Sequence, residues 1–184
     1  MNGRQPKSRL RVNNKANKIT MTYQTFIETK IGRIGIAEEN QLLTHLFFHQ
    51  KKSPTDAVEQ GTPFLRDVAK QLNEYLAGKR KNFDLPLKLY GTDFQLSVWK
   101  ALQTIPYGET RSYGEIAKQI GNPKACRAVG MANHWNPIAI IVPCHRVIGK
   151  DGSLTGFGGG LTLKQQLLDI EASTPCLRFN SETQ

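Results

Sequence analysis

The sequence has few cysteines and no long apolar run. Its three cysteines are odd in number and form no CxxC pair; they stand at Cys126, Cys144 and Cys176. This usage argues against a disulfide framework and a cysteine-based metal site, and it favours a reducing compartment. No run of about 18 to 20 apolar residues and no leader-type apolar core occurs. We therefore expect a cytoplasmic protein with no membrane span and no bound metal.

Acidic residues are absent from the opening of the chain. None precedes Glu28, whereas basic residues stand at Arg4, Lys7, Arg9, Arg11, Lys15 and Lys18. Such a segment predicts a disordered basic tail over residues 1–20. The whole chain has a formal net charge of +10, which favours a polyanionic partner because Lys and Arg displace counterions from phosphates. The alternative is that the charge serves only solubility.

The 184 residues, 39% of them hydrophobic, suffice for one sizeable core or two small ones. A change of pattern at Tyr90-Gly91 divides the chain into a supporting domain over residues 21–90 and a second domain over 91–174, with a tail over 175–184. In the first domain, β-type runs at 23–28, 33–37 and 42–48 predict a strand meander. Thr62-Pro63 then predicts the start of an amphipathic helix that ends by Gly78. The predicted fold class is α/β (α+β).

Helices joined by short turns dominate the second domain. Thr92 with Gln95, and Ser112 with Glu115, each form the pattern of a capping box. After Gly121, Asn122 and Pro123 predict the cap and first residue of a third helix that reaches about residue 133. Two short helices across a glycine-containing turn predict a helix-turn-helix.

The segment Pro143-Cys144-His145-Arg146-Val147 follows the apolar run 138–142. We interpret that run as a buried strand that carries a thiol at its end, beside an imidazole and a guanidinium. Such neighbours can make the sulfur anionic, and the thiolate is the nucleophile. A buried cysteine is otherwise a small core residue. The glycines of residues 152–160 favour the catalytic interpretation, since that density indicates sharp turns or close backbone approach to another molecule.

The third helix carries little bulk. Its small residues are Ala125, Cys126, Ala128, Val129, Gly130 and Ala132, and its charges are Lys124 and Arg127. One interpretation is close packing in the core. The other is that a slim helix enters a confined groove of DNA while Arg127 reaches into the duplex, with few side chains of the kind that read base edges.

Several of these motifs occur together in one known family. The chain resembles the O6-alkylguanine-DNA alkyltransferases, or methylated-DNA–protein-cysteine methyltransferases, from about residue 22 to residue 171. The resemblance rests on five segments in this order: Ile105-Pro106-Tyr107-Gly108-Glu109-Thr110, Ser112-Tyr113, Arg127-Ala128-Val129-Gly130, Asn136-Pro137 and Pro143-Cys144-His145-Arg146-Val147. It implies a ribonuclease-H-like first domain and a mainly helical second domain with the helix-turn-helix and the active-site cysteine.

The resemblance also implies an activity. Such a protein flips an O6-alkylguanine out of duplex DNA and transfers the alkyl group irreversibly to Cys144, without a cofactor and once per molecule. His145 acts through a bridging water as the base, Glu171 orients His145, and Asn136 ties the turn before the cysteine. Because Glu171 falls near the C-terminal end of an apolar helix, where the helix dipole disfavours a carboxylate, we also expect a cationic or hydrogen-bonding partner there. The alternative is an exposed surface glutamate.

The resemblance also implies which residues bind the DNA and the flipped base. Arg127 resembles an arginine finger that fills the gap left by the flipped base, and Tyr113 assists rotation and donates to the guanine ring. The further DNA-binding residues implied are Lys124, Ala125, Ala128 and Gly130. The base pocket implied consists of Val147, Phe157, Gly158, Ala139 and Trp99.

Three positions depart from the family pattern. Phe157 stands where many members carry tyrosine, Gly158 replaces a bulkier small residue, and Ala139 stands where some members have proline. The size of the adduct accepted and activity on O4-alkylthymine are therefore left open. The expected partner is double-stranded DNA bound by a monomer. Three rival readings are a non-catalytic DNA-binding module, a cysteine hydrolase and a helix-turn-helix regulator.

Overall fold

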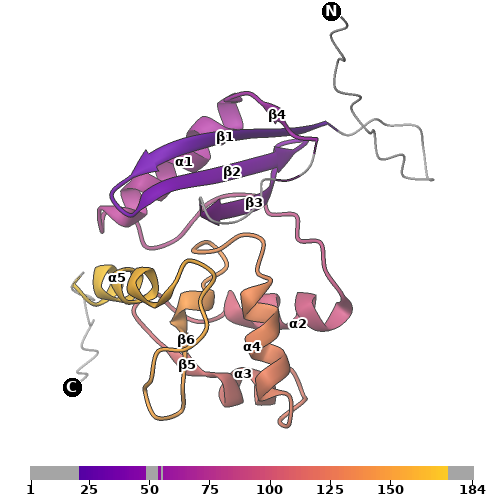
Figure 1. Ribbon diagram of the computed structural model, residues 1–184, viewed down its shortest axis with the longest axis vertical. Coiled ribbons are helices and arrows are strands. Elements are labelled where there is room, and N and C mark those ends of the chain that lie inside the picture. The colour runs from indigo at the N-terminus through magenta and orange to yellow at the C-terminus, as the bar shows by residue number, and fades with distance from the viewer. Residues whose placement is uncertain (1–20, 49–53, 55, 174–184) are drawn as a thin grey trace, which may run out of the picture.

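The computed structural model describes residues 21–48, 54 and 56–173. They form a sheet-and-helix unit followed by a mainly helical unit, as Figure 1 shows. The predicted α/β class is therefore confirmed. Predictions on residues 1–20, Cys176 and residues 175–184 lie outside the described residues. Within the described ranges, no helix is long and apolar enough to cross a membrane.

The predicted meander is present. Strands β1 (Thr22–Thr29), β2 (Gly32–Glu39) and β3 (Leu42–Phe48) pair antiparallel in sequence order. A short strand not anticipated from the sequence, β4 (Val58–Glu59), pairs parallel with β1 and gives the sheet order β3-β2-β1-β4. Two residues are too few to show a periodic pattern, so β4 has no sequence signal of its own.

Helix α1 (Pro63–Leu76) begins where its sequence signals place it. Thr62 caps it by accepting a hydrogen bond from the Leu65 amide at 3.1 Å, and Pro63 opens its first turn. Its buried face carries Leu65, Val68, Leu72, Tyr75 and Leu76, which belong to one core with the sheet. In Figure 1 the helix runs along one face of the sheet.

The free edge of β3 connects the two units. The Leu43 amide donates to the Pro86 carbonyl and the Leu43 carbonyl accepts from the Lys88 amide, both at 2.9 Å. Further along the same strand, the Leu46 amide donates to the Pro137 carbonyl at 2.8 Å. The chain between the units and the loop that precedes the cysteine are therefore held by one strand.

The second unit contains α2 (Asp93–Leu102), α3 (Tyr113–Gln119), α4 (Cys126–His134) and α5 (Leu161–Ala172). Both predicted capping boxes are present at the starts of α2 and α3. The predicted start of the third helix is wrong: α4 begins at Cys126, with Ala125 at its N-cap. Asn122 and Pro123 lie instead in a turn that the Ala125 amide closes by donating to the Asn122 carbonyl at 3.0 Å.

The predicted buried strand at residues 138–142 is also wrong. Ile138 makes a single bridge to Leu46, and the Ile141 amide donates to the Ala139 carbonyl at 2.9 Å. Ile140 between them has φ of 72°, so the chain makes a γ-turn in a conformation that a β-branched residue rarely adopts. Cys144 therefore begins a 3₁₀ helix, η1 (Cys144–Arg146), instead of ending a strand. Strand β6 (Val147–Ile148) follows and pairs parallel with β5 (Arg111–Ser112).

Candidate active site

Cys144 is buried, with 3% of its surface exposed, and lies beside a buried amide. Asn136 Nδ2 donates to the Cys144 Sγ at 3.1 Å and to the Val142 carbonyl at 2.7 Å, while its Oδ1 accepts from the Ile138 amide at 3.0 Å. One side chain thus ties both ends of the turn together. Its N–H also favours the anionic form of the sulfur, because a donor stabilises the charged state.

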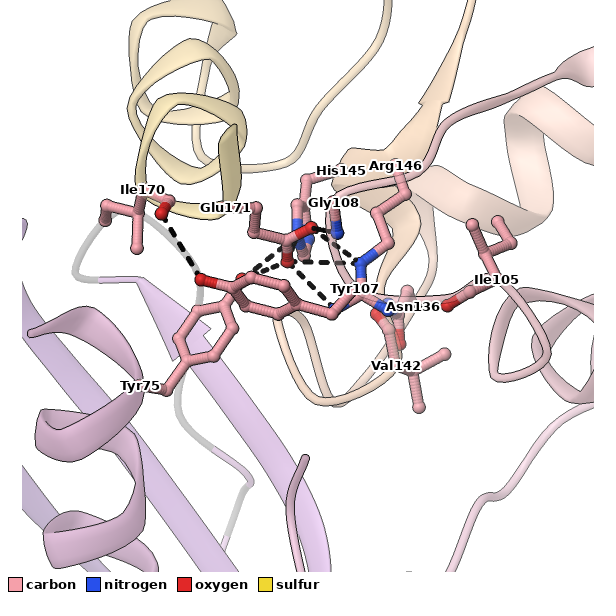
Figure 2. Close-up of polar contacts among 10 residues, drawn as sticks. All are labelled: Tyr75, Ile105, Tyr107, Gly108, Asn136, Val142, His145, Arg146, Ile170 and Glu171. Atoms are coloured by element: carbon pink, nitrogen blue, oxygen red, sulfur yellow. Dashed lines mark hydrogen bonds and ion pairs between the residues drawn. The ribbon is translucent and has the colours of Figure 1, made fainter. Parts of the chain in front are cut away.

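Glu171, near the end of α5, is surrounded by donors. Arg146 Nε lies 3.1 Å from Oε1 and 3.0 Å from Oε2, and Arg146 Nη2 lies 2.9 Å from Oε1. The Gly108 amide donates to Oε2 at 2.9 Å, from a turn in which Gly108 has φ of 78°, a conformation that favours glycine. The partner expected for a carboxylate at this helix end is therefore present. Figure 2 shows these groups converging on Glu171.

Two further side chains complete the network. His145 Nε2 lies 3.0 Å from Glu171 Oε1, and the Tyr75 hydroxyl donates to the same oxygen at 2.5 Å. The Tyr75 oxygen is also 3.2 Å from His145 Nε2. Tyr75 comes from α1 of the first unit, as Figure 2 shows, and sequence reasoning missed it. Its helical spacing with other apolar residues indicated a core position, and nothing local pointed to its hydroxyl.

The network fixes the orientation and the tautomer of His145. An ionised carboxylate only accepts hydrogen bonds, so the His145 Nε2 that faces Glu171 must carry the proton. The unprotonated nitrogen is then Nδ1, which is buried and has no hydrogen-bond partner among the described residues. Such a nitrogen can accept a proton.

The pKa values follow from this arrangement. Burial alone would raise the pKa of Glu171, but hydrogen bonds from His145 and Arg146, with a smaller contribution from Tyr75, hold it at about 2. Burial lowers the pKa of His145, and the nearby Glu171 only partly offsets this. Burial and the Glu171 charge raise the pKa of Tyr75. The site therefore holds an ionised Glu171, a neutral His145 and a neutral Tyr75.

Lys164 and Tyr113 meet near the cysteine. The Lys164 ammonium donates to the Val147 carbonyl at 2.5 Å and to the Thr155 carbonyl at 2.7 Å, and the Tyr113 hydroxyl donates to the Thr155 carbonyl at 2.9 Å. Burial lowers the pKa of Lys164 to about 8, while the negative charge of Cys144 opposes that shift. Sequence reasoning missed Lys164, although a lysine within the apolar pattern of α5 was a visible signal.

Helix α4 divides its small residues between two faces. Val129 and Ala132 are buried, and Gly130 is half-buried beside the Tyr113 ring. Arg127 and Ala128 are exposed, as is Lys124 in the turn before the helix. Both interpretations of the slim helix therefore apply to part of it, since the buried residues pack in the core and the exposed ones are available to a partner.

The residues predicted to line the base pocket lie in different surroundings. Val147 and Ala139 are buried, and Phe157 and Gly158 are half-buried, with the Phe157 ring 5.8 Å from that of Phe48. Trp99 is 1% exposed, and its Nε1 donates to the Ala132 carbonyl at 2.9 Å. Trp99 thus anchors α4 from within the core, and a pocket role for these residues stays a prediction.

Comparison with known proteins identifies the family. Residues 22–89 match the family model described as 6-O-methylguanine DNA methyltransferase, ribonuclease-like domain, and residues 93–173 match the DNA binding domain of the same enzyme. The methylated-DNA–protein-cysteine methyltransferase of Methanosarcina acetivorans is 51% identical over 82% of this chain and 99% of its own length. The constitutive enzyme of Bacillus subtilis is 50% identical over 82% of this chain and 96% of its own length. The chain belongs to the methylated-DNA–protein-cysteine methyltransferase family.

Solved structures of this family share the fold. The Mycobacterium tuberculosis O6-methylguanine methyltransferase has a TM-score of 0.79 and 52% sequence identity, over 85% of this chain and 96% of that chain. A second structure, of the M. tuberculosis OGT in complex with DNA, has the same TM-score and identity over 84% of this chain and 96% of that chain. The family resemblance stated from the sequence motifs is therefore confirmed.

Proposed function

We propose that this methyltransferase repairs DNA by moving an alkyl group from the O6 atom of a guanine to the Sγ atom of Cys144. The observation that carries the proposal is the geometry around the sulfur. A buried thiol receives an amide N–H, and its neighbour His145 presents an unprotonated Nδ1 while Glu171, Arg146 and Tyr75 hold the opposite side of the ring. This arrangement suits a thiol that must lose its proton in a buried site.

The reaction is a displacement at the alkyl carbon. His145 Nδ1 takes the thiol proton through a bridging water, and the sulfur attacks the carbon in line with the C–O6 bond. The S–C bond forms as the C–O6 bond breaks, and its electron pair passes to the guanine. The guanine ring then gains a proton in place of the alkyl group, which leaves neutral guanine in the DNA and a thioether at Cys144. Since a thioether is not hydrolysed under ordinary conditions, each molecule reacts once, and the step needs no metal or cofactor.

Access to the lesion requires base flipping. Extruding a nucleotide costs a few kcal/mol in pairing and stacking, and less for a damaged pair. Arg127, exposed on α4, fills the gap in the stack. Tyr113 turns its hydroxyl from the Thr155 carbonyl to the guanine ring, and the carbonyls of Cys144 and Val147 accept from the guanine amino group.

The finer assignments belong to the same proposal. The partner is double-stranded DNA that carries O6-alkylguanine, bound by a monomer in the cytoplasm through Arg127, Lys124, Ala125, Ala128 and Gly130. Val147, Phe157, Gly158, Ala139 and Trp99 shape the base pocket. The complex of the M. tuberculosis relative with DNA supports DNA as the partner.

The test is intact-mass analysis after incubation with a duplex that contains O6-methylguanine. One added methyl group on Cys144, mapped by digestion, together with restored guanine in the DNA is the expected result. Cys144→Ala should bind the duplex and transfer nothing. Repeated turnover would indicate a cysteine hydrolase, and binding without a mass change would indicate a recognition module. Transfer that persists in Cys144→Ala would move the nucleophile to another cysteine.

A further inference from the structure

Two large apolar side chains stand exposed on α4 close to Arg127. Met131 is 56% exposed, and Trp135, at the C-cap of the helix, is 60% exposed. They follow Arg127 at intervals of four residues, and residues four apart lie on the same side of a helix. With a rise of about 1.5 Å per residue, the three side chains span about 12 Å along one helical face.

Packing within the fold does not explain why Met131 and Trp135 are large and apolar. Neither belongs to the apolar core or to the partly buried residues packed against it within the described chain. The Trp135 ring makes an edge contact with the His134 ring, with centroids 5.3 Å apart. Among the described residues, the other exposed large apolar side chains lie outside α4: Met21, Val58, Tyr90 and Leu161. Exposed apolar residues that gather beside a binding residue indicate a contact surface.

The charge around the pair indicates the partner. Helix α4 contains no acidic residue, and Lys124 and Arg127 lie at the start of its exposed face. A positive face with an apolar strip suits a duplex, whose phosphates attract the cations while its sugars and bases offer apolar surface. Proteins that open the minor groove often place apolar side chains there. A positively charged protein partner fits this face less well, because Lys124 and Arg127 would repel it.

We propose that Met131 and Trp135 form an apolar extension of the DNA-binding face, which packs on the nucleotides that flank the extruded one. This inference rests on the proposed function, since it takes Arg127 as the residue that enters the stack. Adjacent bases on one strand are about 3.4 Å apart, so Trp135 lies within reach of nucleotides a few steps from Arg127. Met131 contacts the sugars between them, and the indole stacks on a base or sugar of the distorted strand.

The two tryptophans of the chain make this contact directly measurable. Trp99 is buried and Trp135 is exposed, so titration of the full-length protein with a duplex containing O6-methylguanine should quench the emission of Trp135 alone. The DNA-dependent change should be present in the wild type and absent in Trp135→Phe. An emission change that survives in Trp135→Phe, or no change in the wild type at saturating duplex, overturns the proposal.

Affinity measurements give a second, independent test. Trp135→Ala should weaken duplex binding by about tenfold at fixed salt, in line with the loss of one stacked base, and Met131→Ala should weaken it by a smaller factor. Met21→Ala, which removes another exposed methionine from the sheet unit, is the matched control and should leave duplex affinity unchanged. Equal affinities for Trp135→Ala and the wild type overturn the proposal, as does a change of oligomeric state in Trp135→Ala, which would make this face a contact between copies.

Alkyl transfer from the isolated O6-methyldeoxyguanosine nucleoside separates this inference from the proposed function. Trp135→Ala should methylate Cys144 from the nucleoside at the wild-type rate, because the indole touches only the flanking DNA. A reduced nucleoside rate means that the substitution disturbs the site itself and overturns the proposal. Failure of the wild type to transfer from either substrate would defeat the proposed function, while the fluorescence and affinity results would still report on Trp135.

Discussion

At the scale of single residues, Tyr75 connects the first unit to the chemistry. Its hydroxyl donates a hydrogen bond that stabilises the charge of Glu171, which in turn holds His145. In Tyr75→Phe the carboxylate should attract a protonated imidazole more strongly, so the pKa of His145 should rise. We expect slower alkyl transfer near neutral pH and an acid limb of the single-turnover pH profile displaced to higher pH. Loss of a hydrogen bond to a charged group should also lower the free energy of unfolding by about 1.5–3 kcal/mol.

Tyr107→Phe is the matched control for that variant. The Tyr107 hydroxyl donates to the Ile170 carbonyl at 3.2 Å, on the same side of the site but away from the carboxylate. It should lose less stability and keep the wild-type pH profile. A Tyr75→Phe profile that coincides with that of the wild type would reduce Tyr75 to a packing residue.

The low pKa of Glu171 predicts that the protein loses stability in acid. The folded-state pKa of about 2 lies below the ordinary value of 4.5, so the ionised carboxylate stabilises the fold fully above pH 4.5 and this contribution is lost as the pH falls toward 2. Glu171→Gln cannot titrate. The difference in unfolding free energy between wild type and variant should therefore shrink by on the order of 3 kcal/mol between pH 6 and pH 2. Denaturant titrations at several pH values measure it, and a constant difference would contradict the assigned shift.

At the scale of elements, α4 carries a buried amide side chain with no hydrogen-bond partner in the part of the chain that the structure describes. Asn133 is 3% exposed, and neither its Nδ2 nor its Oδ1 is hydrogen-bonded within the described residues. A buried amide left unsatisfied costs about 1–3 kcal/mol. Asn133→Leu should therefore raise the free energy of unfolding, measured in urea. Asn136→Leu should lower it, because that amide makes three contacts. A destabilised Asn133→Leu would mean that the amide has a partner after all.

The same elements explain how far the sequence could predict the structure. The meander, α1 and both capping boxes rest on local patterns, so the alternation of strands and the caps at Thr62, Thr92 and Ser112 predict them. The run at 138–142 looked like a strand because it is apolar and buried. Its γ-turn at Ile140 accompanies a bridge between Ile138 and Leu46 of β3, which is distant in sequence, and a hydrogen bond from the Ile138 amide to the Asn136 side chain.

The residues of the site also divide into those that local sequence patterns predict and those that they do not. Cys144, His145 and Asn136 lie within one short segment and could be predicted together, and the place of Glu171 followed from the family motif and its helix end. Tyr75 lies 96 positions before Glu171 and comes from the other unit. No local pattern in the sequence indicates a contact of that kind, and only the tertiary fold brings Tyr75 of α1 beside Glu171 of α5 and His145 of η1.

At the scale of the whole molecule, the two units are joined by strand β3 and by the Tyr75–Glu171 contact. Leu46 of β3 is 1% exposed, and its amide donates to the Pro137 carbonyl at 2.8 Å in the loop that precedes the cysteine. Because β3 packs in the core and is also hydrogen-bonded to the second unit, the two units should unfold together. We therefore expect a single transition in urea when Trp99 emission, which reports on the second unit, is compared with far-ultraviolet circular dichroism in Trp135→Phe.

Leu46→Ala tests whether β3 carries that coupling. Truncating a buried leucine should lower the free energy of unfolding by about 2–5 kcal/mol, and both probes should shift to the same lower midpoint. The Leu46 amide remains in the variant, but the cavity left by the side chain should loosen the strand that holds the loop at Pro137, so alkyl transfer to Cys144 should also slow, although no side chain of the site is changed. Val58→Ala, on the exposed edge of the same sheet, should shift neither probe appreciably and should leave the transfer rate unchanged. Two separate transitions in Leu46→Ala, with the Trp99 midpoint unmoved, would show that the second unit is stable without the sheet.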